Sequence, residues 1–314
     1  MRAAFATAIT QLAGRDPRIM LLTADLGFGV LTEYARRFPR QYLNVGVAEQ
    51  NLMGLAVGLA LEGRTVFAYS IGNFPTLRCL EQLRNDACYH LANVKVVSVG
   101  AGLGYGALGM SHHATEDVSI CRTLPNITVV SPGDAWEAHE ATLALAAHPG
   151  PALLRLGKSA ALTANLPGEQ FELGKARMLR DGPDVTLVAS GSILAEVLRA
   201  ADGLAQRGIF CRVLSMHTVK PLDVGALVAA ARETGGIITV EEHTVEGGLG
   251  GAVAEGLLEL GQVPKVFHRI ALREPFPSVV GSQEYLRTIY GISAGDVVET
   301  VEARLRSRRL GAHV

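Results

Sequence analysis

Cysteine is scarce in this chain of 314 residues, which contains only four, and no two of them form a CxxC pair. Their spacing also matches no common metal-ligand pattern, so the sequence predicts neither a disulfide framework nor a cysteine-bound metal. Isolated thiols of this kind are typical of a reduced protein, and we expect a cytoplasmic location. The four cysteines are Cys79, Cys88, Cys121 and Cys211.

An excess of one charge and a long apolar run are also missing. The formal net charge is −1 and the pI is about 6.8, which indicates no basic face for nucleic acid or an anionic membrane. The longest Gly/Ala/Leu stretch, Leu52 to Leu61, is about half of the roughly 20 residues that a membrane span needs. Near the N-terminus, Phe5, Ile9 and Leu12 recur at helical spacing, which predicts an amphipathic helix rather than a signal peptide. We expect no nucleic-acid or membrane partner.

The chain does contain a regular alternation of strand-like and helical segments. Short apolar runs bounded by Gly, Pro or Asn alternate with helical patterns, which predicts mainly parallel sheets with helices on both faces. The length suggests about two domains. Proline and glycine gather between the two halves, so we predict an α/β domain at 1–158, a linker at 159–182 and a second α/β domain at 183–314.

The predicted elements of each domain can be given by their residue ranges. The first domain is expected to contain strands at Ile19–Ala24, Thr65–Ser70, Val94–Val99, Ile127–Ser131 and Ala152–Leu156, with helices at Glu49–Glu62, Leu77–Leu91 and Ala135–Ala147. The second is expected to contain strands at Val185–Ser190, Phe210–Ser215, Ile237–Glu241 and Lys265–Ile270.

A glycine-rich segment, Gly104–Gly109, matches the GxGxxG pattern of dinucleotide-binding loops. No helix is expected to begin directly after it, and no acid follows at the distance that ribose recognition needs, so nicotinamide binding is disfavoured. The glycines are better explained by a close approach of the backbone to a ligand or a neighbouring chain.

Three side chains are candidates for chemistry, and each has a simpler alternative. Glu49 lies at the start of an apolar helix, where it either complements the helix dipole or shares a proton with a ligand nitrogen. Phe74, just past a strand, is either a core aromatic or a ring that stacks on a planar ligand. His112 is a surface residue, a metal ligand or a proton-transfer group. Because no further His or Cys stands at ligand spacing, we predict no metal site in this chain.

Several segments, taken in order along nearly the whole chain, resemble the C-terminal half of transketolase. The resemblance rests on Asp25–Gly27, Asn44–Asn51, Glu81–Asn85, Gly109–Asp117, Leu124–Asn126, Leu214–Asp223 and Val240–His243. It implies a pyrimidine-binding domain followed by a transketolase C-terminal domain, and a site for thiamine diphosphate.

The resemblance also implies a role for individual residues. Glu49 matches the glutamate that hydrogen-bonds the aminopyrimidine ring nitrogen and so promotes deprotonation of the thiazolium carbon. Phe74 matches the aromatic residue that stacks on the pyrimidine, and Ile71 matches another wall of that site. His112 matches a histidine that contacts donor hydroxyls and assists proton transfer. Asp25 and Leu26 match positions beside the cofactor.

One part of the family pattern is missing from this chain. The diphosphate and its divalent metal, Mg²⁺ or Ca²⁺, need a Gly-Asp-Gly motif followed about thirty residues later by Asn. The resemblance places that motif in the N-terminal half. The chain is therefore expected to be the pyrimidine-side subunit of a split transketolase, which shares the cofactor with an N-terminal subunit in an α2β2 assembly.

Other departures concern the sugar or sugar-phosphate substrates. Leu108 stands where the family has an aspartate that reads an acceptor hydroxyl. Among the phosphate-binding positions Arg2 is kept, Lys158 replaces a common arginine, Gly100 replaces a histidine and Gly29 replaces a serine. A lysine supplies a point charge without the bidentate fork of arginine. We therefore expect substrates other than the standard pentose-phosphate pair.

These inferences lead to one expected function and two alternatives. The expected function is transfer of a two-carbon ketol unit from a ketose to an aldose, with activity only in the presence of the partner. One alternative is the beta subunit of a 2-oxo acid dehydrogenase, which shares both domains and the activating glutamate. The other is a non-catalytic regulatory or interaction subunit.

Overall fold

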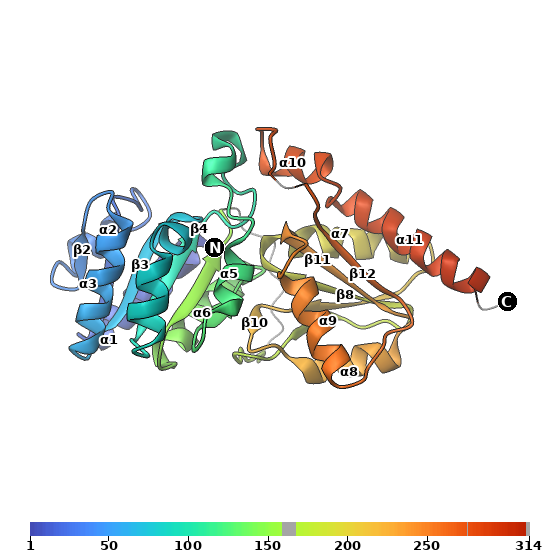
Figure 1. Cartoon of the computed structure of the whole chain (residues 1–314), viewed down its shortest axis with the longest axis horizontal. Coiled ribbons are helices and arrows are strands. Elements are labelled where there is room, and N and C mark those ends of the chain that lie inside the picture. Colours follow the sequence, from blue (N-terminus) through green and yellow to red (C-terminus); the bar gives the residue numbers. More distant parts are fainter. Residues whose placement is uncertain (159–167, 275, 312–314) are drawn as a thin grey trace.

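The computed structural model describes residues 1–158, 168–274 and 276–311, which form two α/β domains side by side along the long axis (Figure 1). The first sheet has the strand order β10-β5-β6-β4-β3-β1-β2, and its neighbours are parallel except for β10 and β5. Its strands are β1 (Ile19–Thr23), β2 (Tyr42–Asn44), β3 (Thr65–Ile71), β4 (Val94–Val99), β5 (Thr128–Val130), β6 (Ala152–Leu156) and β10 (Thr218–Lys220).

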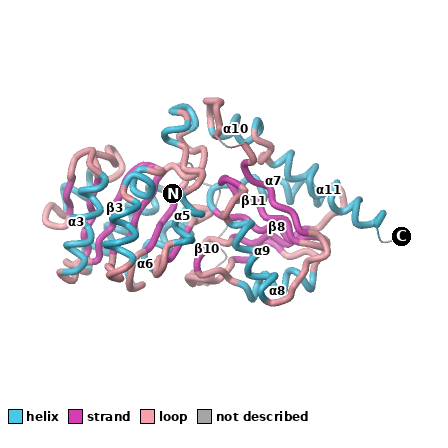
Figure 2. Tube along the Cα trace, in the orientation of Figure 1, coloured by secondary structure: helices cyan, strands magenta, loops and turns pink. Residues whose placement is uncertain are grey.

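Helices cover both faces of the first sheet because its central strands are apolar on both sides (Figure 2). On one face the core contains residues of α1 (Arg2–Arg15), α2 (Thr32–Arg37) and α6 (Ala135–Ala147). On the other face it contains residues of α3 (Glu49–Leu61) and α5 (Asp117–Thr123). The side chain of Asp134 caps α6 by accepting the backbone N–H of Glu137 at 2.7 Å.

The second sheet has the order β12-β11-β8-β9-β7 and is parallel except for the pair β7 and β9. Its strands are β7 (Arg177–Arg180), β8 (Val185–Ser190), β9 (Cys211–Ser215), β11 (Ile237–Thr244) and β12 (Phe267–Leu272). One core cluster holds residues of α7 (Leu194–Ala205), α10 (Gln283–Ile289) and α11 (Ala294–Gly311), and another holds residues of α8 (Val224–Glu233) and α9 (Leu249–Glu259). The predicted fold class, two mainly parallel α/β domains, is confirmed.

Three strands, β2, β7 and β10, lie outside the ranges expected from sequence. β2 pairs parallel with β1 at one edge of the first sheet. β7 falls inside the segment predicted as linker, because it pairs antiparallel with β9 at the edge of the second sheet. β10 follows β9 of the second domain but pairs antiparallel with β5, so it completes the first sheet. The first part of the predicted linker, residues 159–167, lies outside the described residues.

The helix predicted at residues 77–91 is wrong as a regular α-helix. The chain instead forms two π-helical segments, η1 (Phe74–Arg78) and η2 (Leu83–Cys88), around the short α4 (Leu80–Gln82). Pro75 lacks a backbone N–H and so cannot donate to a regular ladder here. Such wide turns are frequent at functional sites, and this one carries Phe74.

Within the described residues, no helix is long and apolar enough to cross a membrane.

Candidate cofactor and substrate site

Glu49 begins α3, and its side chain is 1 % exposed. One carboxylate oxygen accepts a bond from Nη1 of Arg78 at 2.5 Å, and the other lies 3.4 Å from the Ser70 hydroxyl. Ser70 is buried in β3, so the acid at the helix start reaches across to the neighbouring strand. The structure therefore gives Glu49 polar contacts beyond its own helix.

Arg78 connects Glu49 to Phe74. Its guanidinium carbon lies 4.2 Å from the centre of the Phe74 ring, a distance typical of a cation–π contact. The arginine side chain is 45 % exposed, whereas the carboxylate that it contacts is buried. Sequence reasoning missed Arg78, which lies in the same π-helical turn as Phe74 and matches none of the quoted family motifs.

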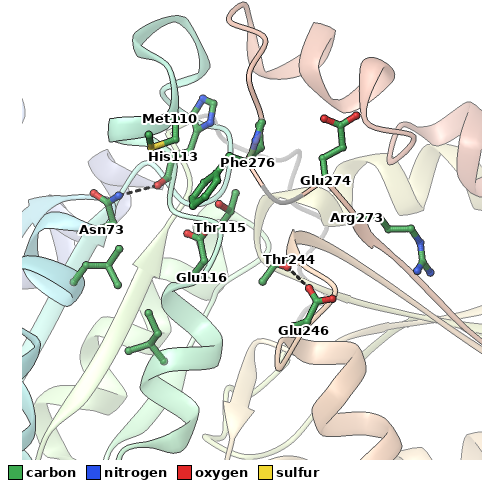
Figure 3. Close-up of a pocket in the computed structure, with 13 residues that line it drawn as sticks. Asn73, Met110, His113, Thr115, Glu116, Thr244, Glu246, Arg273, Glu274 and Phe276 are labelled. Carbon is green, nitrogen blue, oxygen red and sulfur yellow. Dashed lines mark hydrogen bonds between the residues drawn. The ribbon is translucent and has the colours of Figure 1, made fainter.

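His112 lies next to the same aromatic ring. The imidazole and the Phe74 ring have centroids 5.2 Å apart in an edge-on arrangement. The Ser111 hydroxyl is 3.0 Å from His112 Nδ1. The side-chain amide of Asn73 donates to the backbone carbonyl of His113 at 3.0 Å, which ties the segment of Phe74 to that of His112 (Figure 3). The structure thus connects Glu49 to Phe74 through Arg78 and places His112 against the same ring.

Arg2 and Lys158 line one cavity of about 620 Å³, although they lie at opposite ends of the first domain's sequence. Tyr105 and Leu108 line it too, and the Lys158 ammonium lies 4.8 Å from the centre of the Tyr105 ring. The Tyr105 ring is 6.4 Å from that of His112, so this cavity adjoins the group around Phe74. The predicted substrate-binding cations therefore share a single space with the leucine that replaces an aspartate.

The glycine at position 100 is explained by Tyr105. A Cβ atom built on Gly100 would lie 2.1 Å from Cδ2 of the Tyr105 ring, so the ring occupies the room that a side chain would need. Gly100 has a φ of +89°, which also favours glycine. We call residues 100–109 the glycine loop. In this loop the Tyr105 ring occupies the space that a side chain at position 100 would need, and it lines the cavity. Around Gly29, by contrast, a Cβ would meet nothing within 4 Å.

The remaining predicted cofactor residues lie at the carboxyl edge of the first sheet, where open α/β sheets bind ligands. Ile71 is the last residue of β3 and is half-buried. Asp25 follows β1 in a left-handed conformation with φ +56°, held by a hydrogen bond from the Asn44 amide at 3.0 Å. Leu26 packs against the core cluster of α1 and α6. They share an edge with Phe74, but none of the described contacts joins them to Glu49.

A second cavity, of about 560 Å³, lies between the domains beside this group. Asn73 and His113 line it from the first domain and Thr244 and Arg273 from the second (Figure 3). Burial lowers the pKa of His113 and so disfavours its protonated form. Among the described residues, no group of three or more His, Cys, Asp or Glu side chains is arranged to hold a metal ion.

Comparison with known proteins accounts for this geometry. Residues 1–162 match the pyrimidine binding domain of transketolase, and residues 174–297 match its C-terminal domain. The chain belongs to the transketolase family. This family depends on thiamine diphosphate, and its pyrimidine-binding domain is the part of this chain that contains Glu49, Phe74 and His112.

Two curated relatives in the transketolase family are subunits of split enzymes. A 6-deoxy-6-sulfo-D-fructose transketolase subunit from Clostridium sp. (strain MSTE9) is 38% identical over 95% of this chain and 92% of its own length. An apulose-4-phosphate transketolase subunit from Phocaeicola vulgatus is 40% identical over 82% of this chain and 83% of its own length. A solved split gene transketolase, described as an inactive beta4 tetramer, is 39% identical with a TM-score of 0.87, covering 97% of this chain and 98% of that one.

Proposed function

We propose that this chain is the C-terminal subunit of a split thiamine diphosphate-dependent transketolase, which transfers a two-carbon ketol unit from a ketose to an aldose. The observation that carries the proposal is the arrangement of Glu49, Arg78 and Phe74. A planar, nitrogen-bearing cation lies on the Phe74 ring and donates to a buried carboxylate.

The contacts of Arg78 allow the fit of Glu49 and Phe74 to the cofactor to be judged. An aminopyrimidine needs an aromatic surface for its flat face and a carboxylate for its ring nitrogen. The Arg78 guanidinium uses both of these in the chain alone, so it acts as a stand-in for the pyrimidine. Because Arg78 is 45 % exposed, it can move towards solvent when a ring takes its place.

Each residue then has a defined task. When bound, thiamine diphosphate supplies a carbon nucleophile for the ketose carbonyl. Glu49 holds a proton at the pyrimidine ring nitrogen, and its burial keeps water from competing for that bond. Phe74 fixes the plane of the ring by stacking. His112, edge-on to Phe74, binds donor hydroxyls and moves protons near neutral pH.

We further propose that an N-terminal subunit supplies the other half of the cofactor site. The sequence contains no Gly-Asp-Gly motif, so this chain provides no counterpart for the diphosphate or for its Mg²⁺ or Ca²⁺ ion. The similarity to subunits of split enzymes over nearly their full length supports a separate partner polypeptide. We propose an α2β2 assembly with the cofactor at the interface between unlike subunits.

The residues that line the cavity next to His112 favour substrates other than the standard pentose phosphates. Leu108 is 55% exposed and offers the acceptor no carboxylate, and Lys158 offers a single-point cation. The relatives act on a sulfonated ketose and on apulose 4-phosphate, by their names. We propose a ketose whose anionic end lies between Arg2 and Lys158 and is held less strictly than by a pair of arginines.

Reconstitution tests this function. The chain, the N-terminal subunit and their mixture are each titrated with thiamine diphosphate and Mg²⁺ by calorimetry, and only the mixture should bind. The mixture is then assayed with 6-deoxy-6-sulfo-D-fructose, apulose 4-phosphate and xylulose 5-phosphate as donors. Turnover of pyruvate with an artificial electron acceptor, without ketol transfer, would instead identify a 2-oxo acid dehydrogenase subunit. Efficient use of xylulose 5-phosphate with ribose 5-phosphate would contradict the substrate proposal alone.

A further inference from the structure

Glu242 is a buried residue of the second domain, and its carboxylate is hydrogen-bonded to the glycine loop of the first domain. It is 2% exposed and lies in β11. Its Oε1 atom accepts the backbone N–H of Leu103 at 2.6 Å and the side-chain amide of Gln283 at 2.7 Å. Its Oε2 atom accepts Nε of Arg287 at 2.6 Å. One carboxylate thus joins the glycine loop to two residues of α10.

The backbone around Glu242 makes the same connection in a second way. A Cβ built on Gly102 would lie 2.5 Å from Glu242 Oε1 and 2.7 Å from its carbonyl oxygen, so the two segments touch with no room for a side chain. Nη2 of Arg155 donates both to the Glu242 carbonyl at 3.1 Å and to the Ala114 carbonyl at 2.7 Å. The end of β11 is therefore fastened to both Gly102 and Ala114.

Gly102 and Ala114 in turn define the position of His112. They form an isolated antiparallel bridge with two backbone hydrogen bonds, of 3.0 Å from Gly102 N and 2.9 Å from Ala114 N. This bridge closes the loop that carries Tyr105 and His112. Next along β11, the Thr244 N–H donates to the Thr115 carbonyl at 2.8 Å, which extends the attachment.

We propose that Glu242 is a positioning residue for His112, so that the second domain contributes to catalysis by holding the loop that bears this histidine. The inference rests on the proposed function, because it concerns the role given there to His112. Glu242 itself touches neither Phe74 nor Glu49, and it acts through the bonds to Leu103 and the bridge between Gly102 and Ala114.

The neighbouring residue provides a matched control. Glu241 is 3% exposed, lies in the same strand and also accepts two backbone N–H groups, from Leu249 at 2.6 Å and Gly250 at 2.8 Å. Both belong to α9 of its own domain. Glu241→Ala should therefore lower the thermal midpoint of the chain without changing the kinetics of the ketose donor.

A double-mutant cycle in the reconstituted enzyme tests the proposal. Glu242→Ala should lower kcat/KM for the ketose donor by about 100-fold, the size expected when a catalytic group is misplaced by about 1 Å. In a His112→Ala background the same change should cost no more than about 2-fold, because coupled residues are not additive. Glu242→Gln keeps an acceptor for Leu103 N–H and should restore most of the loss.

The outcomes separate this proposal from the function on which it rests. If His112→Ala leaves donor turnover unchanged, the role of His112 in the proposed function is wrong. If His112→Ala is impaired but Glu242→Ala costs the same factor in both backgrounds, the positioning role is wrong. Should Glu242→Ala fail to fold, Gly102→Ala replaces it. Gly102→Ala forces the loop away from Glu242 and must then show the same loss of effect in the His112→Ala background.

Discussion

Glu49 and Glu242 are both nearly fully buried carboxylates, yet their surroundings differ. Glu242 lies at the domain interface and accepts bonds from Leu103, Gln283 and Arg287, all within the same chain. Glu49 lies at the cofactor edge, where its 2.5 Å partner is a half-exposed arginine. The interface carboxylate is held by fixed neighbours, whereas the one at the cofactor edge is held by a group that can be exchanged.

Other ion pairs at the domain interface resemble Glu242 rather than Glu49. Asp117 and Arg155, both of the first domain, form a pair beside the interface with both side chains at most 3% exposed, and Arg155 also donates to the Glu242 carbonyl at 3.1 Å. Arg177 of the second domain reaches Asp134 and Glu137 of the first, with its guanidinium 4.5 Å from the Trp136 ring centre. The comparison teaches that the buried charges near the domain interface are paired with buried partners, whereas the buried Glu49 is paired with a half-exposed arginine.

The largest effect, on the activity of the reconstituted enzyme, is expected at Glu49. Glu49→Gln should lower kcat of the reconstituted enzyme by about 10²–10⁴-fold, because an amide cannot hold the shared proton. Steady-state assays with the ketose donor measure this effect. Glu62→Gln, an exposed glutamate at the end of the same helix, is the control and should leave kcat unchanged. Retention of full activity by Glu49→Gln would favour a non-catalytic subunit.

A comparably large effect, on stability rather than activity, is expected at the ion pairs in which both side chains are buried. Asp117→Asn leaves Arg155 buried without its counter-charge and should lower the free energy of unfolding by about 3–5 kcal/mol. Urea denaturation of the chain measures it. Asp202→Asn breaks the exposed pair with Arg180 and should cost under about 1 kcal/mol. Equal losses in the two variants would remove the distinction between interface and surface pairs.

A smaller effect concerns pH. Burial raises the pKa of Glu137 from its ordinary value of 4.5 to about 7, with a further contribution from the nearby Asp134. A carboxyl with a raised pKa stabilises the fold fully below about pH 4.5 and loses that contribution as the pH rises through about 7. The stability of the wild type relative to Glu137→Gln should fall by on the order of 2 kcal/mol between pH 4.5 and 8. A difference that stays constant with pH would show that Glu137 remains ionised throughout.

The smallest effect tests the proposal that Arg78 occupies the place of the pyrimidine in the chain alone. Arg78→Ala should destabilise the chain alone by about 1 kcal/mol, because the buried Glu49 loses its donor. In the complex saturated with thiamine diphosphate the difference in thermal midpoint should shrink, and kcat should stay within about 10-fold. Arg84→Ala, which removes an arginine bonded to Asn85, is the control. A loss of activity as large as that of Glu49→Gln would show that Arg78 takes part in the reaction.

The sequence predicts strands and helices well where a buried segment is bounded by residues that interrupt regular structure. The ranges Ala152–Leu156 and Val185–Ser190 match β6 and β8 because Gly, Pro or Asp residues bound fully buried runs, and Ala135–Ala147 matches α6, which Asp134 caps. The π-helical turns around α4 escaped prediction, because an apolar run alone does not reveal a change in helical pitch. β10 escaped it as well, since its partner β5 is distant in the sequence.

The candidate site was predictable only as far as the family resemblance extended. Glu49, Phe74 and His112 were identified from it, and the structure brings them together. The positions of Arg78 and Glu242 depend on a local turn and on a contact between domains, which spacing along the chain does not reveal. The role of each residue in the reaction stays a prediction.

The strand β10 has a consequence for attempts to divide this protein. It supplies the outer edge of the first sheet, and the Lys220 ammonium that ends it donates to the carbonyls of Arg122 at 2.9 Å and Leu124 at 2.5 Å. A fragment that stops at residue 158 would expose β5 as an unpaired edge, the kind of surface that promotes aggregation. The smallest piece of this chain suited to separate expression is therefore both domains together.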